Sequence, residues 1–196
     1  MFFLFLYINC ADGLFHIQQQ VVAQVSVELA EAHRLEAVAQ LRADQVGTWL
    51  RERTAQVRFG ADDPLGELVG GWLDRGGGAT YDKVLDRLAN YHRASAGHGV
   101  MVIDRQGLVL ASVGKHVAFS LELADVAAQA FAADGLRFTR PYLGGADWRD
   151  RYIDIAAPLV QSGQPARAVL VLRLHVNDFL VPTLGHWPLP GRTASS

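Results

Sequence analysis

Several residue types are scarce in this sequence, and each scarcity excludes a class of protein. The 196 residues include a single cysteine, Cys10, so the chain forms no intrachain disulfide, no CxxC redox pair and no multi-cysteine zinc site. Only two lysines occur, and the formal net charge is −2. A general nucleic-acid binder needs a strongly basic face, so this charge argues against nucleic acid as a partner. Glycine and proline, with 19 and 7 residues, are near average, which excludes collagen-like and low-complexity chains.

The N-terminal apolar run is short. A membrane-spanning helix needs about 20 apolar residues, whereas the uncharged stretch MFFLFLYI covers residues 1–8. Three interpretations remain open: it is the outer end of a transmembrane helix, the start of a helix that packs on the domain, or a lipoprotein signal that ends at Cys10. We treat residues 1–14 as an apolar N-terminal segment, which is the remnant of a transmembrane helix under the first interpretation.

The sequence also lacks the local motifs of common catalytic and nucleotide-binding sites. It has no GxSxG, no HExxH, no paired-carboxylate motif and no phosphate-binding fingerprint. We therefore expect neither enzymatic activity nor a cofactor. His92 and His98 flank a loop where a metal could bind, but solvated or capping histidines are the interpretation that we adopt, and we expect no metal site. Asp147, Asp150 and Asp154 could bind a cation, but the interpretation that we adopt for them is a solvated loop.

A long amphipathic helix is predicted for residues 15–58. From position 17 onward this stretch has no proline and one glycine, Gly47. Its apolar residues recur at intervals of three, four or seven, the period of a helix with one apolar face. These residues are Val22, Val25, Leu29, Ala32, Ala39, Ala43, Val46, Leu50 and Val57. Such a face packs either on the chain's own sheet or on a second copy, and we favour a stalk-like helix that forms a homodimer.

The pattern changes at residue 59, and short helices and strands alternate up to residue 187. Helices are predicted at 65–73, at 81–94 with Thr80 as N-cap, at 121–134 and, as a closing turn, at 176–184. Apolar runs predict strands at 99–104, 108–112, 136–142, 152–157 and 168–174. The last run is the most hydrophobic, so we expect it to be central and buried on both faces. The fold class is α+β: a long N-terminal helix, then an antiparallel sheet of about five strands flanked by helices, with a flexible tail at 188–196.

Four segments carry a resemblance to a known family. The hairpin VIDRQGLVLAS at 102–112 has the D-x-x-G turn of the extracytoplasmic PAS-like sensor domains of the Cache type, which it resembles. The segment QVGTWLRER at 45–53 is similar to the W-L-x-E-R stretch of the first helix in such sensors. RYIDIAAPL at 151–159 and FLVPTLGHWP at 179–188 are similar to their Y-x-D-x-x-x-P and F-L-x-P-x-L-x-x-W-P segments. The matches span about residues 41–193.

This resemblance implies a function in signal transduction. Domains of this type lie between two transmembrane helices and precede a histidine kinase or diguanylate cyclase output, which would lie C-terminal of this chain. We therefore expect a ligand-sensing domain on the periplasmic side of the bacterial inner membrane, attached through flanking helices. It would pass a ligand-dependent conformational shift to the cytoplasmic output. The alternative is a soluble PAS-like dimerisation or interaction module without a small-molecule ligand.

Polar and aromatic residues gather around one predicted loop and the strand after it. They mix guanidinium donors, aromatic rings and a carboxylate, the inventory of a site for a small polar ligand. We predict that the ligand-binding residues are Arg140, Tyr142, Trp148, Arg149, Tyr152 and Asp154, with His116 closing the pocket after the hairpin. Tyr152 and Asp154 share one face of their strand because side chains alternate along it. The arginines suit a carboxylate and the aspartate suits an ammonium, so we expect a carboxylate or zwitterion.

Overall fold

The computed structural model describes the backbone of residues 2–62, 64–115, 120–144, 150–160 and 164–185. Side chains are described from residue 22 onward, with residues 181 and 183–185 excepted. The chain forms two units, Met1–Gly47 and Thr48–Ser196, and each is described by itself. The elements follow the predicted α+β order, with helices first, then a hairpin, a helix and further strands.

The first unit consists of one helix. It belongs to α1, Phe2–Asp62, which includes the predicted apolar segment and the predicted stalk. Several apolar side chains on this unit are more than half exposed, among them Val22 at 68%, Val25 at 54% and Leu29 at 58%. Among the described residues, none of the helices contains a stretch long and apolar enough to cross a membrane. The N-terminal part of the predicted apolar face is therefore exposed to solvent in the single chain.

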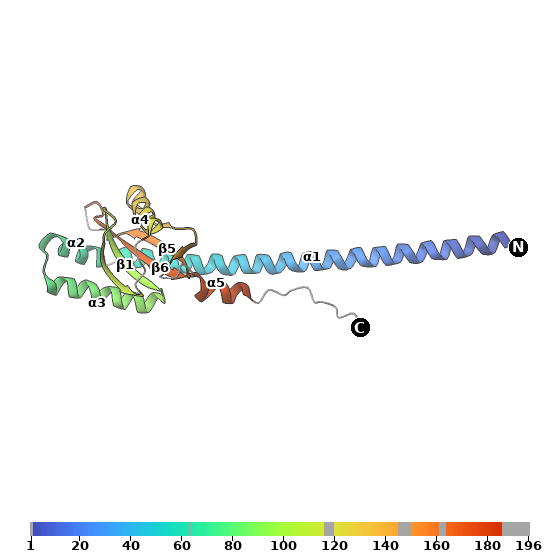
Figure 1. Cartoon of the computed structure of the whole chain (residues 1–196), viewed down its shortest axis with the longest axis horizontal. Helices are drawn as coiled ribbons and strands as arrows, with labels where there is room; N and C mark the ends of the chain where they lie inside the picture. Colours follow the sequence, from blue (N-terminus) through green and yellow to red (C-terminus); the bar gives the residue numbers. More distant parts are fainter. Residues whose placement is uncertain (1, 63, 116–119, 145–149, 161–163, 186–196) are drawn as a thin grey trace. The chain divides into compact units, whose positions relative to one another are not determined.

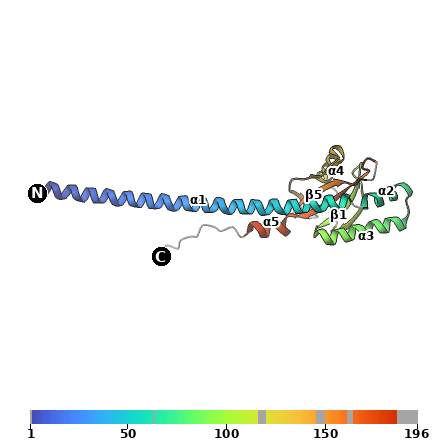
Figure 2. The same cartoon turned by 180° about the vertical axis from the view of Figure 1, so that it is seen from behind.

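The second unit is built around an antiparallel sheet (Figures 1 and 2). Its strands are β1 Gly99–Asp104, β2 Val109–Gly114, β3 Arg137–Phe138, β4 Tyr142–Gly144, β5 Asp150–Pro158 and β6 Ala168–His175. They are ordered β2-β1-β6-β5-β3, and β4 also pairs with β5. The helices of this unit, besides the end of α1, are α2 Leu65–Arg75, α3 Gly78–Ser95, α4 Leu121–Ala133 and α5 Val176–Gly185. The prediction of an antiparallel sheet with flanking helices is confirmed.

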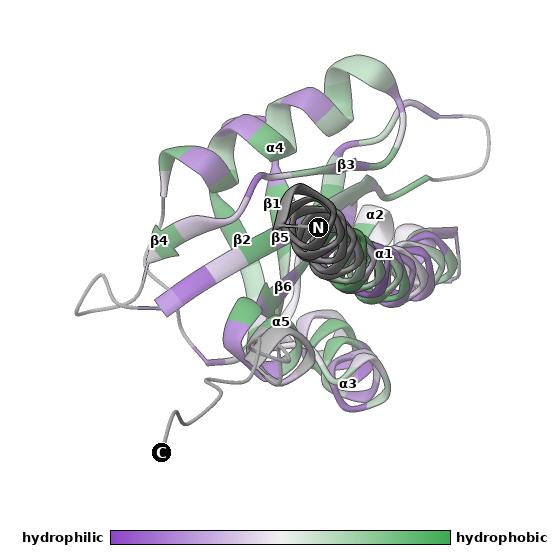
Figure 3. Cartoon of the chain, turned by 90° about the vertical axis from the view of Figure 1, so that its right-hand side faces the viewer, coloured by the Kyte–Doolittle hydropathy of each residue, from purple (hydrophilic) through white to green (hydrophobic). Residues whose placement is uncertain are grey.

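Helices cover both faces of the sheet, and the alternation of side chains along each strand assigns residues to one face or the other. Figure 3 shows α4 on one side and α2 and α3 on the opposite side. On β6, Leu170 and Leu172 pack with residues of α1, α2 and α3, including Val57. Val169 and Val171 of the same strand pack with α4. The prediction that this strand is central and buried on both faces is therefore confirmed.

The C-terminal part of the apolar face of α1 packs within the second unit. Leu50 packs against the core of the second unit, and Val57 is fully buried in it. Trp49 stacks on Phe179 of α5, with ring centroids 4.4 Å apart and planes inclined by 2°. These two rings come from two of the segments that carry the family resemblance. The homodimer prediction can therefore apply only to the part of the face before this region.

Two local predictions are wrong. The predicted strand 136–142 is split into β3 and β4, because Pro141 lies between them and has no N–H to donate to β5. This split raises the number of strands from five to six. Thr80 is not an N-cap: α3 begins at Gly78, and Gly77, whose φ is 98°, occupies the cap position. A glycine adopts this positive φ at little cost, so the helix starts without a capping side chain.

The D-x-x-G turn is held by the side chain of its aspartate. The carboxylate of Asp104 accepts hydrogen bonds from the backbone N–H groups of Gln106 and Leu108, at 2.9 and 2.8 Å. Gly107 has a φ of 82°, which favours glycine, and its N–H donates to the carbonyl of Asp104 at 3.1 Å. The turn fixes the register of the β1–β2 hairpin and explains the spacing seen in the sequence.

Candidate functional site

A buried ion pair lies in the middle of the sheet, on the face that α4 covers. Asp154 of β5 and Arg173 of β6 are directly opposite in the strand register, and both side chains have an exposed fraction of 0%. The guanidinium Nε donates to Oδ1 of the carboxylate at 2.7 Å, and Nη2 donates to Oδ2 at 2.6 Å. Such a two-pronged contact fixes both the distance and the orientation of the two groups.

Two tyrosines enclose this pair. The hydroxyl of Tyr142, on β4, donates to Oδ2 of Asp154 at 2.6 Å. The guanidinium carbon of Arg173 lies 5.8 Å from the ring centre of Tyr142 and 5.5 Å from that of Tyr152. Tyr152 is opposite Tyr142 in the register of β4 and β5, and its own hydroxyl donates to Asp150 at 3.2 Å. The pair is therefore shielded from water by aromatic rings whose faces attract a cation.

The surroundings set the protonation of these groups. Burial raises the pKa of Tyr142 far above its usual value, and the charge of Asp154 and the hydrogen bond to it act in the same direction. Burial lowers the pKa of Arg173, but the hydrogen bonds and charge of Asp154 outweigh it, so the net shift is upward. Tyr142 is therefore a neutral donor and Arg173 a cation at any physiological pH.

One nitrogen of the ion pair has no hydrogen-bond partner. Nη1 of Arg173 is buried and contacts no acceptor within the described residues. Buried polar atoms without a partner are rare in folded proteins, because each one loses its hydrogen bonds to water. An acceptor such as a carboxylate or carbonyl oxygen would satisfy this N–H group.

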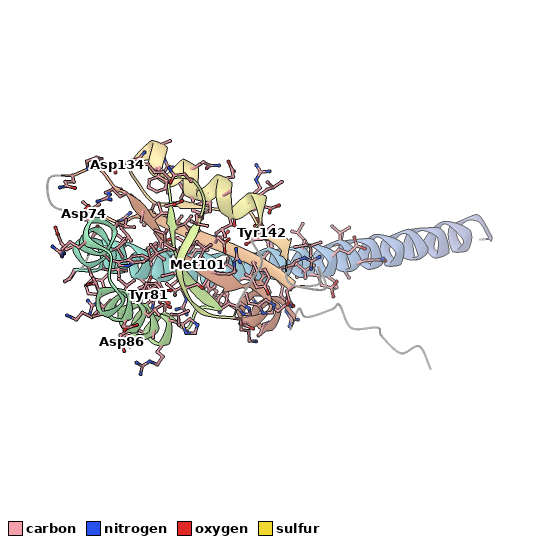
Figure 4. The ribbon with its side chains drawn as sticks, turned by 60° about the vertical axis from the view of Figure 1, so that its left-hand side comes forward. Asp74, Tyr81, Asp86, Met101, Asp134 and Tyr142 are labelled. Carbon is pink, nitrogen blue, oxygen red and sulfur yellow. The ribbon has the colours of Figure 1, made fainter. Side chains whose placement is uncertain are left out.

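A cavity of about 480 Å³ lies between α4 and the segment that joins β3 to β4. Tyr142 lines it and also contacts the ion pair, and Figure 4 labels this residue next to α4. Its other lining residues are Glu122, Asp125, Val126, Gln129, Phe138, Thr139, Arg140 and Pro141. A second cavity, of about 250 Å³, lies between α1 and α3 and contains none of the predicted site residues. Of these two cavities, the one beside α4 is connected to the polar cluster, through Tyr142.

The structure brings three of the predicted site residues together and places a fourth at the edge. Tyr142, Tyr152 and Asp154 form the buried cluster, and Arg140 is exposed and lines the adjacent cavity. The other three predicted residues, Trp148, Arg149 and His116, lie outside the described residues, as does Asp147. The interpretation of Asp154 as part of a solvated loop is wrong, because strand β5 carries it into the core.

Sequence reasoning missed Arg173, the partner of the predicted Asp154. This arginine lies in the run AVLVLRLH, whose apolar residues predict a central strand buried on both faces. A signal was present, since a charged residue in the centre of an apolar strand is costly to bury without a partner. Thr139 was also missed: its hydroxyl accepts a hydrogen bond from the backbone N–H of Asp154 at 3.0 Å.

Comparisons with known proteins identify the fold. No protein-family model and no curated protein sequence matches the chain. Solved structures do match, among them the sensor domain of the V. cholerae histidine kinase DctB, with a TM-score of 0.58 and 16% identity over 72% of this chain. The ligand-binding domain of the Pseudomonas fluorescens chemoreceptor CtaA, in complex with L-serine, matches with a TM-score of 0.53 and 20% identity over 74% of this chain. That of the Pseudomonas aeruginosa amino-acid chemoreceptor PctC, with GABA, matches with 0.55 and 16% over 79%.

These similarities confirm the fold that the sequence resemblance implied. The chain has the fold of receptor sensor and ligand-binding domains, and the matched proteins are sensory domains rather than catalytic ones. The chain spans 54%, 59% and 64% of the length of these three structures. The ligands and activities of the complete receptors therefore belong to those proteins and are not assigned to this chain.

Proposed function

We propose that this chain is the extracytoplasmic ligand-sensing domain of a membrane-bound bacterial receptor. Its ligand is a small carboxylate or zwitterion, bound at the α4 face of the sheet. The observation that carries the proposal is the buried Asp154–Arg173 pair: Nη1 of Arg173 has no partner among the described residues, and Tyr142, which donates to Asp154, lines a cavity. A buried ion pair contributes little net stability, because desolvating its two charges costs free energy and apolar residues of similar volume are often at least as stabilising. Its presence therefore favours a role in recognition.

The side chains provide complementary contacts for such a ligand. Arg140 lines the cavity and carries a guanidinium group that can clamp a carboxylate. Tyr142 connects the cavity to the ion pair, so a ligand that reorients its hydroxyl changes the hydrogen bonding of Asp154. We assign Trp148, Arg149 and His116 to the same site as its covering residues, with Tyr152 as a wall. Signalling follows when the ligand binds one arrangement of sheet and helices better than another.

A thermal-shift screen of amino acids and small carboxylates tests this function. It is carried out on the whole chain in a buffer with EDTA. A ligand at 100 times its Kd stabilises the folded state by about 2.7 kcal/mol, so a true ligand raises the Tm by several degrees. With that ligand, Arg140→Ala is expected to raise the Kd at least tenfold and Tyr142→Phe by about two- to tenfold, the value of one hydrogen bond, both measured by calorimetry.

The controls are Arg58→Ala, an exposed arginine of α1, and Tyr81→Phe, a tyrosine on the opposite face of the sheet. Both are expected to bind the ligand as the parent does. Unchanged Kd values for Arg140→Ala and Tyr142→Phe would place the ligand elsewhere. A screen without any stabilising compound would favour the alternative, a PAS-like interaction module that binds no small molecule.

We further propose that the first unit pairs with a second copy through its apolar face. Val22, Val25 and Leu29 lie at helical spacing and are each more than half exposed, so pairing would remove apolar surface from water. Membrane attachment through flanking helices would raise the effective concentration of the two copies and favour the pair. The periplasmic location belongs to the same proposal.

The double variant Val25→Asp/Leu29→Asp is expected to be monomeric at concentrations where the parent is dimeric. Two charges on each apolar face would meet like charges on the partner helix, at a cost that removes the pairing. Light scattering of parent and variant over a range of concentrations measures this change. The control is Glu28→Asp/Glu31→Asp, which keeps the charge. A dimeric variant, or a parent monomeric throughout, contradicts pairing through this face.

A further inference from the structure

A second polar cluster lies at the end of β6, and none of its side chains lines the cavity beside α4. Its members come from three segments: His98 precedes β1, His175 ends β6, and Asp178 lies in the first turn of α5. The backbone N–H of His98 donates to the carbonyl of Arg173 at 2.8 Å, which holds His98 beside β6. The ring centres of the two histidines are 5.3 Å apart. One nitrogen or oxygen from each of the three side chains lies within 4.8 Å of the others.

His175 has a carboxylate at both of its ring nitrogens. Its Nδ1 lies 3.0 Å from Oδ1 of Asp178, and its Nε2 lies 3.3 Å from Oδ1 of Asp150. In protein metal sites, the imidazole nitrogen that does not bind the ion usually donates to a carboxylate, carbonyl or water, which fixes the ring. Whichever nitrogen of His175 faces an ion, the other one therefore has a carboxylate to orient it.

The cluster is also accessible, and charged groups surround His98. Burial lowers the pKa of His98, and the charges of Lys115 and His175 lower it further, against the weaker opposite effect of Asp178 and Asp150. The side chain of His175 is 15% exposed, whereas those of Asp150 and Asp178 are 50% and 71% exposed. An ion can reach the cluster from the carboxylate side.

We propose that His98, His175 and Asp178 form a binding site for a divalent transition-metal ion. Asp150 is the partner that orients His175 through its other ring nitrogen. Two imidazoles with carboxylates suit Zn²⁺, whereas Mg²⁺ and Ca²⁺ take oxygen ligands. In a tetrahedral site with bonds of about 2.0–2.1 Å, ligand atoms are about 3.3 Å apart. The contact between His175 and Asp178 is already that short, and the widest pair has to close by at most about 1.5 Å.

An ion bound at this site would connect three segments of the chain. It would join the segment before β1 to the end of β6 and to α5. Phe179, the neighbour of Asp178, is the residue that stacks on Trp49 of α1. A bound ion would therefore fix α5 at its contact with α1. None of the four side chains lines the cavity beside α4, but Tyr152 links the two sites, because its ring centre lies 5.1 Å from that of His98 and 5.4 Å from that of His175.

Zinc titration of the whole chain, after removal of metals with EDTA and dialysis, tests the site. Calorimetry is expected to show that His175→Asn and Asp178→Asn each weaken Zn²⁺ binding at least tenfold relative to the parent. The controls are His33→Asn and Asp86→Asn, which change an exposed histidine and an exposed aspartate elsewhere and are expected to bind as the parent does. Equal Zn²⁺ affinities for the parent and both cluster variants would overturn the site.

Two further measurements distinguish loss of the metal site from loss of the fold. Co²⁺ is expected to give visible absorption bands of a tetrahedral complex in the parent and weaker ones in Asp178→Asn. Because Asp178 is largely exposed, this variant is expected to melt at the parent's Tm in EDTA, and Zn²⁺ should raise only the parent's Tm. A rise in the parent's Tm that is equal with Mg²⁺ and Zn²⁺ would overturn the proposal, because oxygen ligands alone would then explain it.

Discussion

Arg173→Met is expected to lower the free energy of unfolding by about 3–5 kcal/mol. The change removes one partner of a fully buried ion pair and leaves the carboxylate of Asp154 charged, with the Tyr142 hydroxyl as its remaining side-chain donor. Methionine is unbranched and of similar length, so the loss reports the charge rather than a large cavity. Urea unfolding followed by circular dichroism measures the difference between parent and variant.

The double variant Asp154→Val/Arg173→Met separates stability from recognition. With both charges gone, neither partner is left unpaired, so most of the stability lost in Arg173→Met is expected to return. If the pair serves recognition, this stable double variant loses the ligand found in the screen. The control is Arg167→Met, which breaks the half-exposed pair with Asp74 and is expected to cost less than 1 kcal/mol. A cost for Arg173→Met as small as that of the control would contradict the burial of the charge.

The fold could be predicted because its signals are local. The period of 3.6 residues identified the helices, and the apolar runs identified the strands, so even the central position of β6 followed from its composition. The predictions failed where a single backbone group decided the outcome. Pro141 interrupts a strand by its missing N–H, and Gly77 replaces Thr80 at a helix start by its positive φ. Neither effect changes the period of hydrophobicity.

The site could be predicted only in part, because its contacts depend on strand register. The sequence does not determine which residues of β5 and β6 are opposite: a hairpin centred on residue 163 would place Asp154 opposite Leu172. The observed partner is Arg173, one position further. A shift of one residue moves every side chain of a strand to the other face, so the ion pair cannot be inferred without the register. The histidine cluster is harder still, since chain spacing gives no hint that His98 and His175 meet.

Leu172→Ala is expected to lower the free energy of unfolding by about 2–5 kcal/mol. Leu172 is fully buried on the central strand, and its side chain occupies the space beside Gly97, where an added Cβ would lie 2.4 Å from Leu172 Cδ1. Both neighbouring strands hold the backbone of β6 in place, so the structure has little freedom to collapse into the cavity. The expected cost therefore combines the lost burial of the side chain with the empty space that remains.

Leu121→Ala is the matched control, because Leu121 is 81% exposed at the start of α4. Its truncation is expected to change the free energy of unfolding by less than about 0.5 kcal/mol. Urea unfolding of the two variants gives both values on one scale, provided that their m-values agree with that of the parent. A lower m-value in Leu172→Ala would mean that the native state had loosened. A change as small as the control's would place Leu172 at an edge of the sheet, contrary to the strand order in which β6 lies between β1 and β5.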